Sequence, residues 1–241
     1  MDSVPSVFVF RQIPSSLADK AFAFHKSQAN NEHIWPRTED QIQSYAKDGE
    51  LFAVLTSSGE FVAMCYSTLD EKENVWEIGG LTTLKEYREL HLGTLLVRFA
   101  LAHTIAWYSP WESAQEIIAH VHDENPAPRN LLKRLAFVFA KKVEVPEGIA
   151  PASMKRNAEG KVTGDEFRFP PPATENLLKW FEEESKAKLA DEKSSAAFEI
   201  DGGMDALIEA LREAVAFTKS KATKPSASPS TSSSTTSPPA T

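Results

Sequence analysis

One segment of the sequence combines residues that suit an anion-binding loop. A predicted strand ends at Thr83, and a loop with Arg88 leads into a helix that begins near Leu92 and has Gly93 in its first turn. The start of a helix leaves backbone N–H groups unpaired and carries the positive end of the helix dipole. Arg88 adds a charged side chain, and Gly93 lets the backbone come close to a ligand. The segment therefore predicts an anion site that suits a pyrophosphate.

Four other side chains could carry acid–base, metal or nucleophilic chemistry. Glu77, on the strand that ends at Thr83, is either a general base or a strand carboxylate that faces solvent or an arginine. His122 ends another predicted strand and could carry a proton, and His120 alternates with it as a possible metal pair. No third ligand has suitable spacing, so we expect no metal site. Cys65, the single cysteine, is either a nucleophile or, as is usual in mid-strand, part of the core.

Composition narrows the class of protein. The net charge of −8 argues against nucleic acid as the main partner, because a nucleic-acid backbone needs a positive footprint. A chain with one cysteine forms no intrachain disulfide, and we expect it in the reducing cytoplasm. The first ten residues lack the basic start and the apolar run of a secretory signal. No stretch of about 18 residues is apolar enough to span a membrane, so we expect no membrane partner.

Periodicity, caps and turns predict the elements that position these residues. Strands are predicted at 7–10, 51–56, 61–68, 75–83, 117–122, 137–145 and 166–169. Helices are predicted from Ser16, from the capping box at Thr38 to Gln41, at 92–108 and from Asn125. Three consecutive strands followed by a strand–helix–strand crossover predict an α/β fold. Its sheet is mixed, mostly antiparallel and flanked by helices on both faces.

The last third of the chain changes in character. We divide the sequence into a main domain at 1–172, a helical C-terminal extension at 173–221 and a disordered tail rich in Ser, Thr and Pro at 222–241. Two helices are predicted in the extension, at 173–190 and 203–219. The second has an apolar stripe at helical spacing, which packs on the main domain or forms a dimer or partner contact, so a homodimer stays possible. The stripe consists of Leu207, Ile208, Leu211, Ala214 and Val215.

Together with the order of elements, the segment around Arg88 resembles the central motif of the Gcn5-related N-acetyltransferase (GNAT) superfamily. In that family a strand leads into an Arg/Gln-x-x-Gly-x-Gly/Ala loop that grips the pyrophosphate of acetyl-CoA. Arg88 and Gly93 fit this pattern, whereas His91 stands at the first glycine and Glu89 at another position where glycine is common. His91 either brings an imidazole near phosphate or faces solvent. The resemblance spans about residues 6–170 and implies a GNAT-like sheet.

A second block, from His122 to Phe137, resembles a later motif of the same family. Asn125 falls where the family uses an asparagine to contact the pantetheine arm, and it is also a good helix cap. The family's frequent tyrosine, which protonates the departing thiolate, corresponds to Leu132. Leucine cannot donate a proton, so the acid must be water or another group. Tyr66, Tyr87 and Tyr108 are either packing residues, which is the more usual role, or replacements for this acid.

The resemblance implies an N-acyltransferase that moves an acetyl group from acetyl-CoA to a primary amine by direct attack in a ternary complex. The strand from Ile78 to Thr83 would splay from its neighbour and offer backbone N–H groups to the pantetheine arm and the acetyl oxygen. Glu77 would be the general base, with His122 as a substitute proton carrier. The implied cofactor-binding residues are Leu81, Thr82, Thr83, Arg88, Glu89, Leu90, His91, Leu92, Gly93, Thr94 and Asn125.

Two alternatives stay open, and the acceptor is not identified. Leu132 and the altered loop favour a catalytically degenerate CoA-binding or protein-interaction module, and a GNAT-like fold without CoA is the third reading. The resemblance implies that residues 18–49 and 143–169 select the acceptor. Acidic residues there are compatible with a cationic amine, and solvated helix faces explain them equally well. These residues are Asp19, Glu32, Glu39, Asp40 and Asp48.

Overall fold

The computed structural model describes residues 7–28, 32–146, 150–184, 197–201 and 203–222. The strands are β1 (Val7–Gln12), β2 (Leu51–Thr56), β3 (Phe61–Asp70), β4 (Val75–Thr83), β5 (Glu116–His122), β6 (Val138–Glu144), β7 (Thr163–Phe169) and β8 (Ala197–Ile200). The helices are α1 (Ala18–Ser27), α2 (Glu39–Lys47), α3 (Leu92–Tyr108), α4 (Pro126–Arg134), α5 (Thr174–Lys179) and α7 (Met204–Ala222). Short 3-10 turns include Lys85–Leu90, directly before α3.

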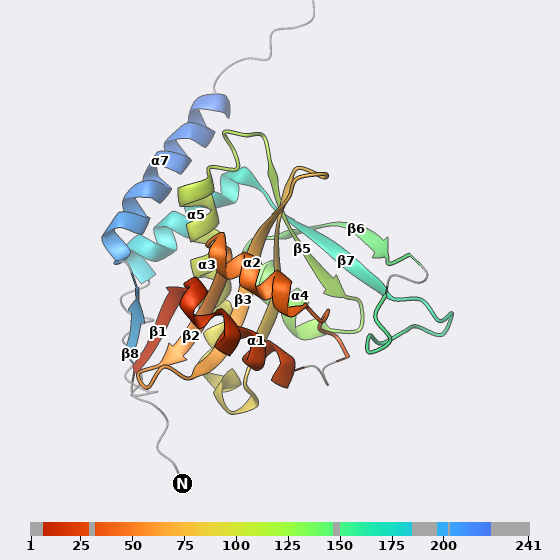
Figure 1. The fold of residues 1–241 in the computed structure, drawn as a ribbon. Helices are drawn as coiled ribbons and strands as arrows, with labels where there is room; N and C mark the ends of the chain where they lie inside the picture. Colours follow the sequence, from red (N-terminus) through yellow and green to blue (C-terminus); the bar gives the residue numbers. More distant parts are fainter. Residues whose placement is uncertain (1–6, 29–31, 147–149, 185–196, 202, 223–241) are drawn as a thin grey trace, which may run out of the picture.

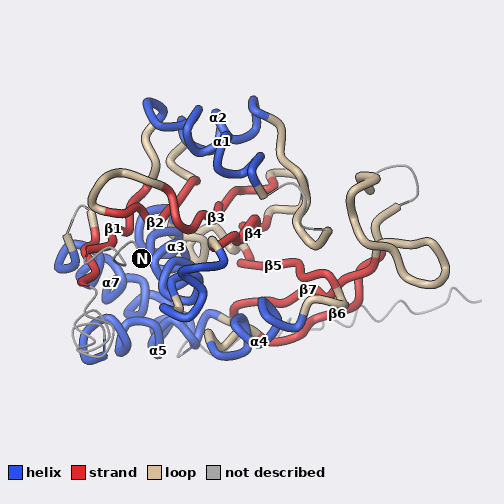
Figure 2. The backbone as a smooth tube through the Cα atoms, turned by 90° about the horizontal axis from the view of Figure 1, so that it is seen from below, coloured by secondary structure: helices blue, strands red, loops and turns tan. Residues whose placement is uncertain are grey.

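The strands form one eight-stranded sheet in the order β6-β7-β5-β4-β3-β2-β1-β8. Only the pairs β4–β5 and β1–β8 are parallel, and the other neighbours are antiparallel. In Figure 2, α1 and α2 lie on one face of the sheet, and α3, α4, α5 and α7 lie on the other. The predicted mixed, mostly antiparallel sheet with helices on both faces is confirmed.

Local sequence signals account for the ends of two helices that position the site. The Thr38 hydroxyl accepts a hydrogen bond from the Gln41 amide at 3.3 Å, and the Gln41 side chain accepts one from the Thr38 amide at 3.0 Å. This reciprocal capping box starts α2 as predicted. The apolar stripe of α3 is buried from Leu92 to Ile105, and the helix has the bounds that its periodicity predicts.

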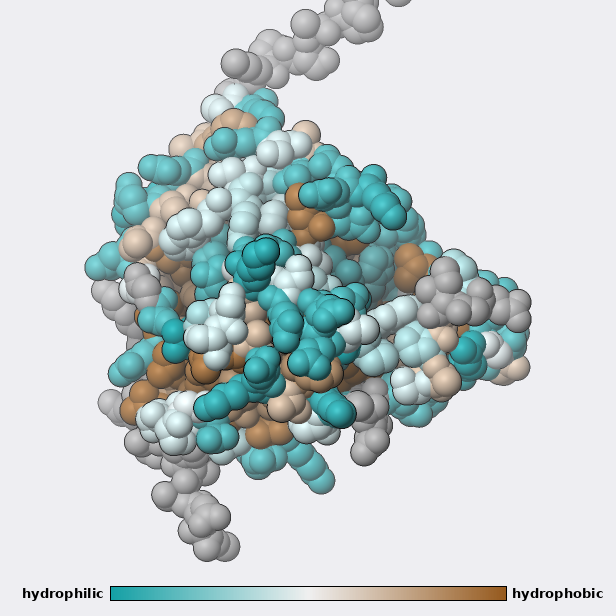
Figure 3. Space-filling view, viewed as in Figure 1, coloured by the Kyte–Doolittle hydropathy of each residue, from teal (hydrophilic) through white to brown (hydrophobic). Residues whose placement is uncertain are grey.

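Two apolar cores occupy the two faces of the sheet. Trp76 and Ile78 of β4 belong to the core under α3. Met64 and Tyr66 of β3 belong to the core under α1 and α2. Because side chains alternate along a strand, Glu77 points to the face that α1 and α2 cover. Figure 3 shows this face, which carries mainly hydrophilic side chains with apolar ones between them.

Two irregularities of β4 shape the centre of the sheet. Its pairing with β5 extends only from Val75↔Glu116 to Glu77↔Ile118, although both strands continue for several residues. On the other side, the register with β3 shifts between Met64↔Thr82 and Tyr66↔Gly79. This shift places one extra residue in β4, which defines a β-bulge. The bulge and the early end of pairing open the sheet after Glu77, as the expected splay requires.

The C-terminal extension adds a strand that the sequence analysis did not predict. β8 pairs in parallel with β1, from Val7↔Ala197 to Phe10↔Ile200, so the extension is not purely helical. Of the predicted helix at 173–190, the structure describes α5 and a π-helical turn at Trp180–Glu184, and residues 185–190 lie outside the described residues. The prediction of a second helix is correct, although α7 starts at Met204 and continues to Ala222.

The apolar stripe of α7 packs within the chain. Leu207, Ile208, Leu211 and Val215 are buried in the core that contains α3, so this surface is not available to a partner (Figure 1). The predicted tail began at Ala222, which belongs to α7, and residues 223–241 lie outside the described residues. The division into domains stays a prediction. Within the described ranges, no helix combines the length and the apolar character needed to cross a membrane.

Candidate active site

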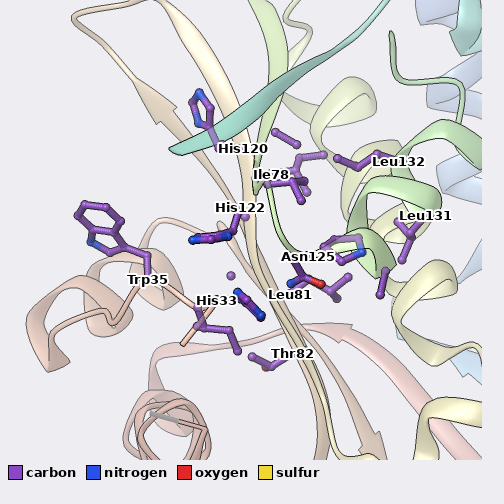
Figure 4. A pocket seen from close by; sticks show the side chains of 18 of the residues that line it. His33, Trp35, Ile78, Leu81, Thr82, His120, His122, Asn125, Leu131 and Leu132 are labelled. Carbon is purple, nitrogen blue, oxygen red and sulfur yellow. The ribbon is translucent and has the colours of Figure 1, made fainter. Parts of the chain in front are cut away.

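A cavity of about 950 Å³ lies where β4 and β5 separate. Residues from both strands, from the start of α3 and from α4 line it. We call the part next to α3 and α4 the helix end of the cavity. The opposite part, beside the segments that join α1 to α2 and β6 to β7, is called the loop end. Figure 4 shows Trp35 on one side of the cavity and Leu131 on the other, with His33 and Asn125 between them.

The helix end contains most of the predicted cofactor-binding residues. Those that line the cavity are Leu81, Thr82, Thr83, Arg88, His91, Gly93, Thr94 and Asn125. The other three do not line it. Leu92 is fully buried in the core, Leu90 packs against that core, and Glu89 is exposed.

The first turn of α3 lies close against the end of β4. A Cβ added to Gly93 would come within 3.2 Å of Thr83 Oγ1 and 3.6 Å of a Leu81 methyl carbon, so glycine permits this approach. The amides of Thr94 and Leu95 bond to the carbonyl of His91, at 2.9 and 3.3 Å. The preceding amides in the first turn have no intrahelical acceptor and can bind an anion.

Two side chains add polar groups to this end. Arg88 Nε donates to the Thr83 carbonyl at 3.3 Å, which fixes the guanidinium and leaves its terminal amino groups for a ligand. Thr82 Oγ1 is buried and has no hydrogen-bond partner among the described residues. A buried hydroxyl at a cavity wall is costly to leave unpaired, and a polar ligand would satisfy it.

The backbone of His91 has the left-handed conformation that glycine adopts more easily, with φ +56° and ψ +20°. The altered loop therefore keeps the geometry that a glycine would give, at a cost of about 1–2 kcal/mol. We expect His91→Gly to raise the free energy of unfolding by about 0.5–1 kcal/mol, because glycine's larger unfolded-state entropy offsets part of the gain. Urea denaturation measures this change. His91→Ala keeps the strain without the imidazole, and equal stability of the two variants would contradict the prediction.

Asn125 occupies the N-cap position of α4, but its side chain makes no capping hydrogen bond. Because it lines the cavity, its amide group is available to a ligand. Leu131 and Leu132 of α4 are buried and line the same wall, so this helix presents no hydroxyl there. Of the tyrosines in the described chain, Tyr66 is the one that lines the cavity.

Glu77 belongs to a cluster of acid–base groups at the point where β4 and β5 separate. His120 Nδ1 lies 3.3 Å from Glu77 Oε1, and His120 Nε2 lies 3.6 Å from Oε2 of the buried Glu166. The hydrogen bond to Glu77 raises the pKa of His120 above its ordinary value, against burial, which lowers it. Both Glu77 and His120 line the cavity. The cluster can accept a proton from a group bound there.

His122 has a different environment from His120. Its Nε2 lies 2.8 Å from the Lys155 carbonyl, and its Nδ1 lies 3.2 Å from the Glu124 amide. Nε2 can therefore donate to the carbonyl while Nδ1 accepts from the amide, which engages both nitrogens. This arrangement favours a structural role, and its role as a proton carrier stays a prediction. No group of three or more His, Cys, Asp or Glu among the described residues could hold a metal ion.

At the loop end, the described parts of the two segments contact each other, and one of them also contacts strand β5. The Lys155 amide donates to the Glu32 carbonyl at 3.0 Å, and the rings of His33 and His122 lie 5.0 Å apart. None of the five acidic residues suggested for an acceptor lines the cavity, which favours the reading that they are solvated. Glu77 and Glu144 are the carboxylates that line it in the described chain.

Four features of the site were missed in the sequence. Arg37 and Trp35, from the segment between α1 and α2, line the loop end, His120 forms a hydrogen bond with Glu77, and β4 contains a bulge. Of these, only the bulge had a local signal, because Gly79 and Gly80 inside a strand indicate a bulge or a close approach. Cys65 is buried in mid-strand away from the cavity, as expected for a core residue.

Comparison with known proteins agrees with this geometry. Residues 19–137 match the model of the acetyltransferase (GNAT) family. The ribosomal-protein-S18-alanine N-acetyltransferase of Escherichia coli has a similar structure, with a TM-score of 0.50 and 14% identity over 68% of this chain and 93% of that one. A candidate acetyltransferase of Acinetobacter baylyi gives a TM-score of 0.51 and 12% identity over 70% and 93%. No curated protein matches the sequence. Residues 19–137 of the chain are therefore similar to the acetyltransferase (GNAT) family.

Proposed function

We propose that this protein transfers an acetyl group from acetyl-CoA to an amine. The observation that carries the proposal is the cavity between β4 and β5, which has the unpaired amides of α3 at one end and the Glu77–His120 pair beside the separating strands. An anion cradle and a proton acceptor in one cavity are what acyl transfer from a CoA thioester to an amine needs. The family match supports the same reaction class.

The helix end has the groups that CoA requires. The first turn of α3 and the Arg88 guanidinium would hold the pyrophosphate, and Gly93 keeps the approach open. The facing edges of β4 and β5 beyond Glu77↔Ile118 make no ladder hydrogen bonds with each other, so their backbone groups can bind the amide units of the pantetheine arm. The free side chain of Asn125 adds one more polar contact.

Acetyl-CoA supplies a thioester whose carbonyl carbon bonds to the amine nitrogen while the carbon–sulfur bond breaks, which gives the acetamide and a thiolate. The chain's own residues orient the two molecules and move protons. The Glu77–His120 pair accepts the proton that the amine must lose. Leu132 offers no proton to the thiolate, so the thiolate takes its proton from water or from Tyr66, which lines the cavity. Positioning in the cavity supplies most of the remaining rate enhancement.

Calorimetric titration with CoA tests the cradle. We expect Arg88→Ala to weaken CoA affinity by about 1–3 kcal/mol, because a charged hydrogen-bond donor to the pyrophosphate is lost. Arg212→Ala on the exposed surface of α7, where Arg212 pairs with Glu182 and Glu209, is the matched control and should bind CoA like the unchanged protein. An undiminished affinity of the Arg88 variant would count against the proposed pyrophosphate site.

A second function is favoured by two observations. Leu132 stands where a proton donor would be useful, and the strained His91 stands in the loop, so a CoA-binding module without catalysis is possible on this fold. The two functions differ in one readout, the acceptor-dependent release of free CoA thiol. Thiol release with any amine in a broad panel supports the enzyme. CoA binding with no release across the panel supports the module.

A further inference from the structure

Arg37 at the loop end of the cavity is held in place by several contacts. Its backbone amide donates to His25 Nε2 at 2.9 Å, and its Nη2 donates to the Tyr66 hydroxyl. The guanidinium carbon lies 4.8 Å from the centre of the Tyr66 ring, and the Tyr45 ring packs on Tyr66 at 5.0 Å. The side chain is therefore oriented within the cavity wall before any ligand binds.

Among the described residues, this arginine makes no direct ion pair, unlike the buried charges on the nearby strand β7. Glu166 bonds to Arg168 and Lys141, and Asp165 bonds to Arg129 and Lys142. Arg37 makes no direct ion pair with a carboxylate in the described ranges, although the nearby charge of Glu77 contributes to raising its pKa, and its Nε is buried without a hydrogen-bond partner. A fixed, half-buried cation without a direct ion pair is stabilised by a ligand that brings a negative charge into contact with it.

The charge and shape of the loop end indicate which anion would bind Arg37. Among the described residues that line the cavity, Arg37 is the one arginine or lysine at the loop end, since Arg88 and Arg134 lie at the helix end. One cation balances one negative charge, and the planar guanidinium matches the planar carboxylate group. A carboxylate therefore suits the position better than a phosphate dianion.

On the basis of the proposed function, we infer that the acceptor is an amino acid. Its amine contacts the Glu77–His120 pair, and its carboxylate binds Arg37. All three residues line the same cavity. Besides polar residues such as His33 and Glu144, the loop end has several apolar side chains, which suit an apolar side chain of the acceptor. These include Ile34, Trp35, Val145, Met154 and Val162.

The experiment compares amino acids with their carboxamides, which keep the amine and the side chain but lack the carboxylate. Binding to the protein saturated with CoA is measured by thermal shift and calorimetry, with apolar and polar side chains in the panel. We expect at least one apolar amino acid to bind about 10- to 100-fold more tightly than its carboxamide. Arg37→Gln should remove this preference, and Arg37→Lys should keep part of it.

Controls separate a change of preference from a loss of folding. Tyr66→Phe keeps Arg37 and removes the hydroxyl that orients it, so a smaller loss of preference is expected, even if Arg37→Gln fails to fold. Arg212→Gln should leave the preference unchanged. If no amino acid binds more tightly than its carboxamide, or if the preference survives in Arg37→Gln, the inference is overturned.

Turnover separates this inference from the proposed function. Acetylation of amino acids and carboxamides at equal rates would overturn the inference and support the proposed function. Binding of an amino acid through Arg37 without any acetylation would support the binding site and contradict the proposed function.

Discussion

Glu77→Gln is expected to lower kcat by about 10²-fold or more, within the 10²–10⁴-fold range of general base catalysis, and to leave CoA affinity unchanged. Glutamine keeps the size of the side chain but cannot hold the proton that the amine loses. The residue lines the cavity beside the separating strands, whereas the amides and Arg88 of the cradle lie at the helix end. Steady-state kinetics and CoA calorimetry on the same variant measure the two effects. Equal loss of both would argue against the base role.

The pH profile gives an independent check on the Glu77–His120 pair. Its hydrogen bond raises the pKa of His120, so the ring stays protonated to a higher pH than an ordinary histidine. A protonated ring cannot accept the amine proton, so kcat/KM should rise as pH passes through this raised pKa. Glu77→Gln removes the main cause of the raised pKa of His120. The acid limb of the kcat/KM profile should therefore move to lower pH in this variant. An unchanged limb would exclude the pair as its origin.

Two further variants test whether the pair acts as a unit. His120→Gln should reduce turnover about as much as Glu77→Gln, and the double variant should lose little more than either single one. Glu144→Gln is the matched control, because Glu144 also lines the cavity but pairs with the exposed Lys161 at 3.0 Å. It should retain activity. Additive losses in the double variant would show that Glu77 and His120 act separately.

The elements around this site were predictable because their signals are local. The capping box at Thr38, the proline after Asn125 and the 3.6-residue period of α3 each depend on residues within a few turns of one another. The order of elements then implied the mixed sheet. Strand β8 was missed because a four-residue parallel strand at an edge has no turn partner and too short a pattern.

The site itself was only partly predictable, since its contacts depend on register. Glu77 and His120 are 43 residues apart, and they meet because Glu77 pairs with Ile118 on the adjacent strand. Period-two alternation placed His120 and His122 on one face, but it did not show that one bonds to Glu77 and the other to the Lys155 carbonyl. Arg37 carries no local signal, because its orientation depends on Tyr66 of β3, which is 29 residues away in the sequence.

Substitution of Gly80 should have the largest effect on stability, because two separate penalties coincide there. Its φ is +63°, and an added Cβ would lie 2.5 Å from Cε1 and 2.7 Å from Cδ1 of the Tyr66 ring. Tyr66 is buried in the core under α1 and α2, so the ring has little room to move. We expect Gly80→Ala to lower the free energy of unfolding by about 2–4 kcal/mol, the sum of backbone strain and overpacking.

A matched glycine separates the two penalties. Gly160 has a similar φ of +78°, but an added Cβ would meet nothing within 4 Å. Gly160→Ala should therefore cost only the strain of about 1–2 kcal/mol, and the difference between the two variants in urea denaturation measures the contact with Tyr66. The bulge at Gly80 also sets the direction of the β4 backbone in the cavity. We therefore expect the folded molecules of Gly80→Ala to have a lower turnover number than the unchanged protein. A variant with full activity per folded molecule would show that acetyl transfer does not depend on the bulge.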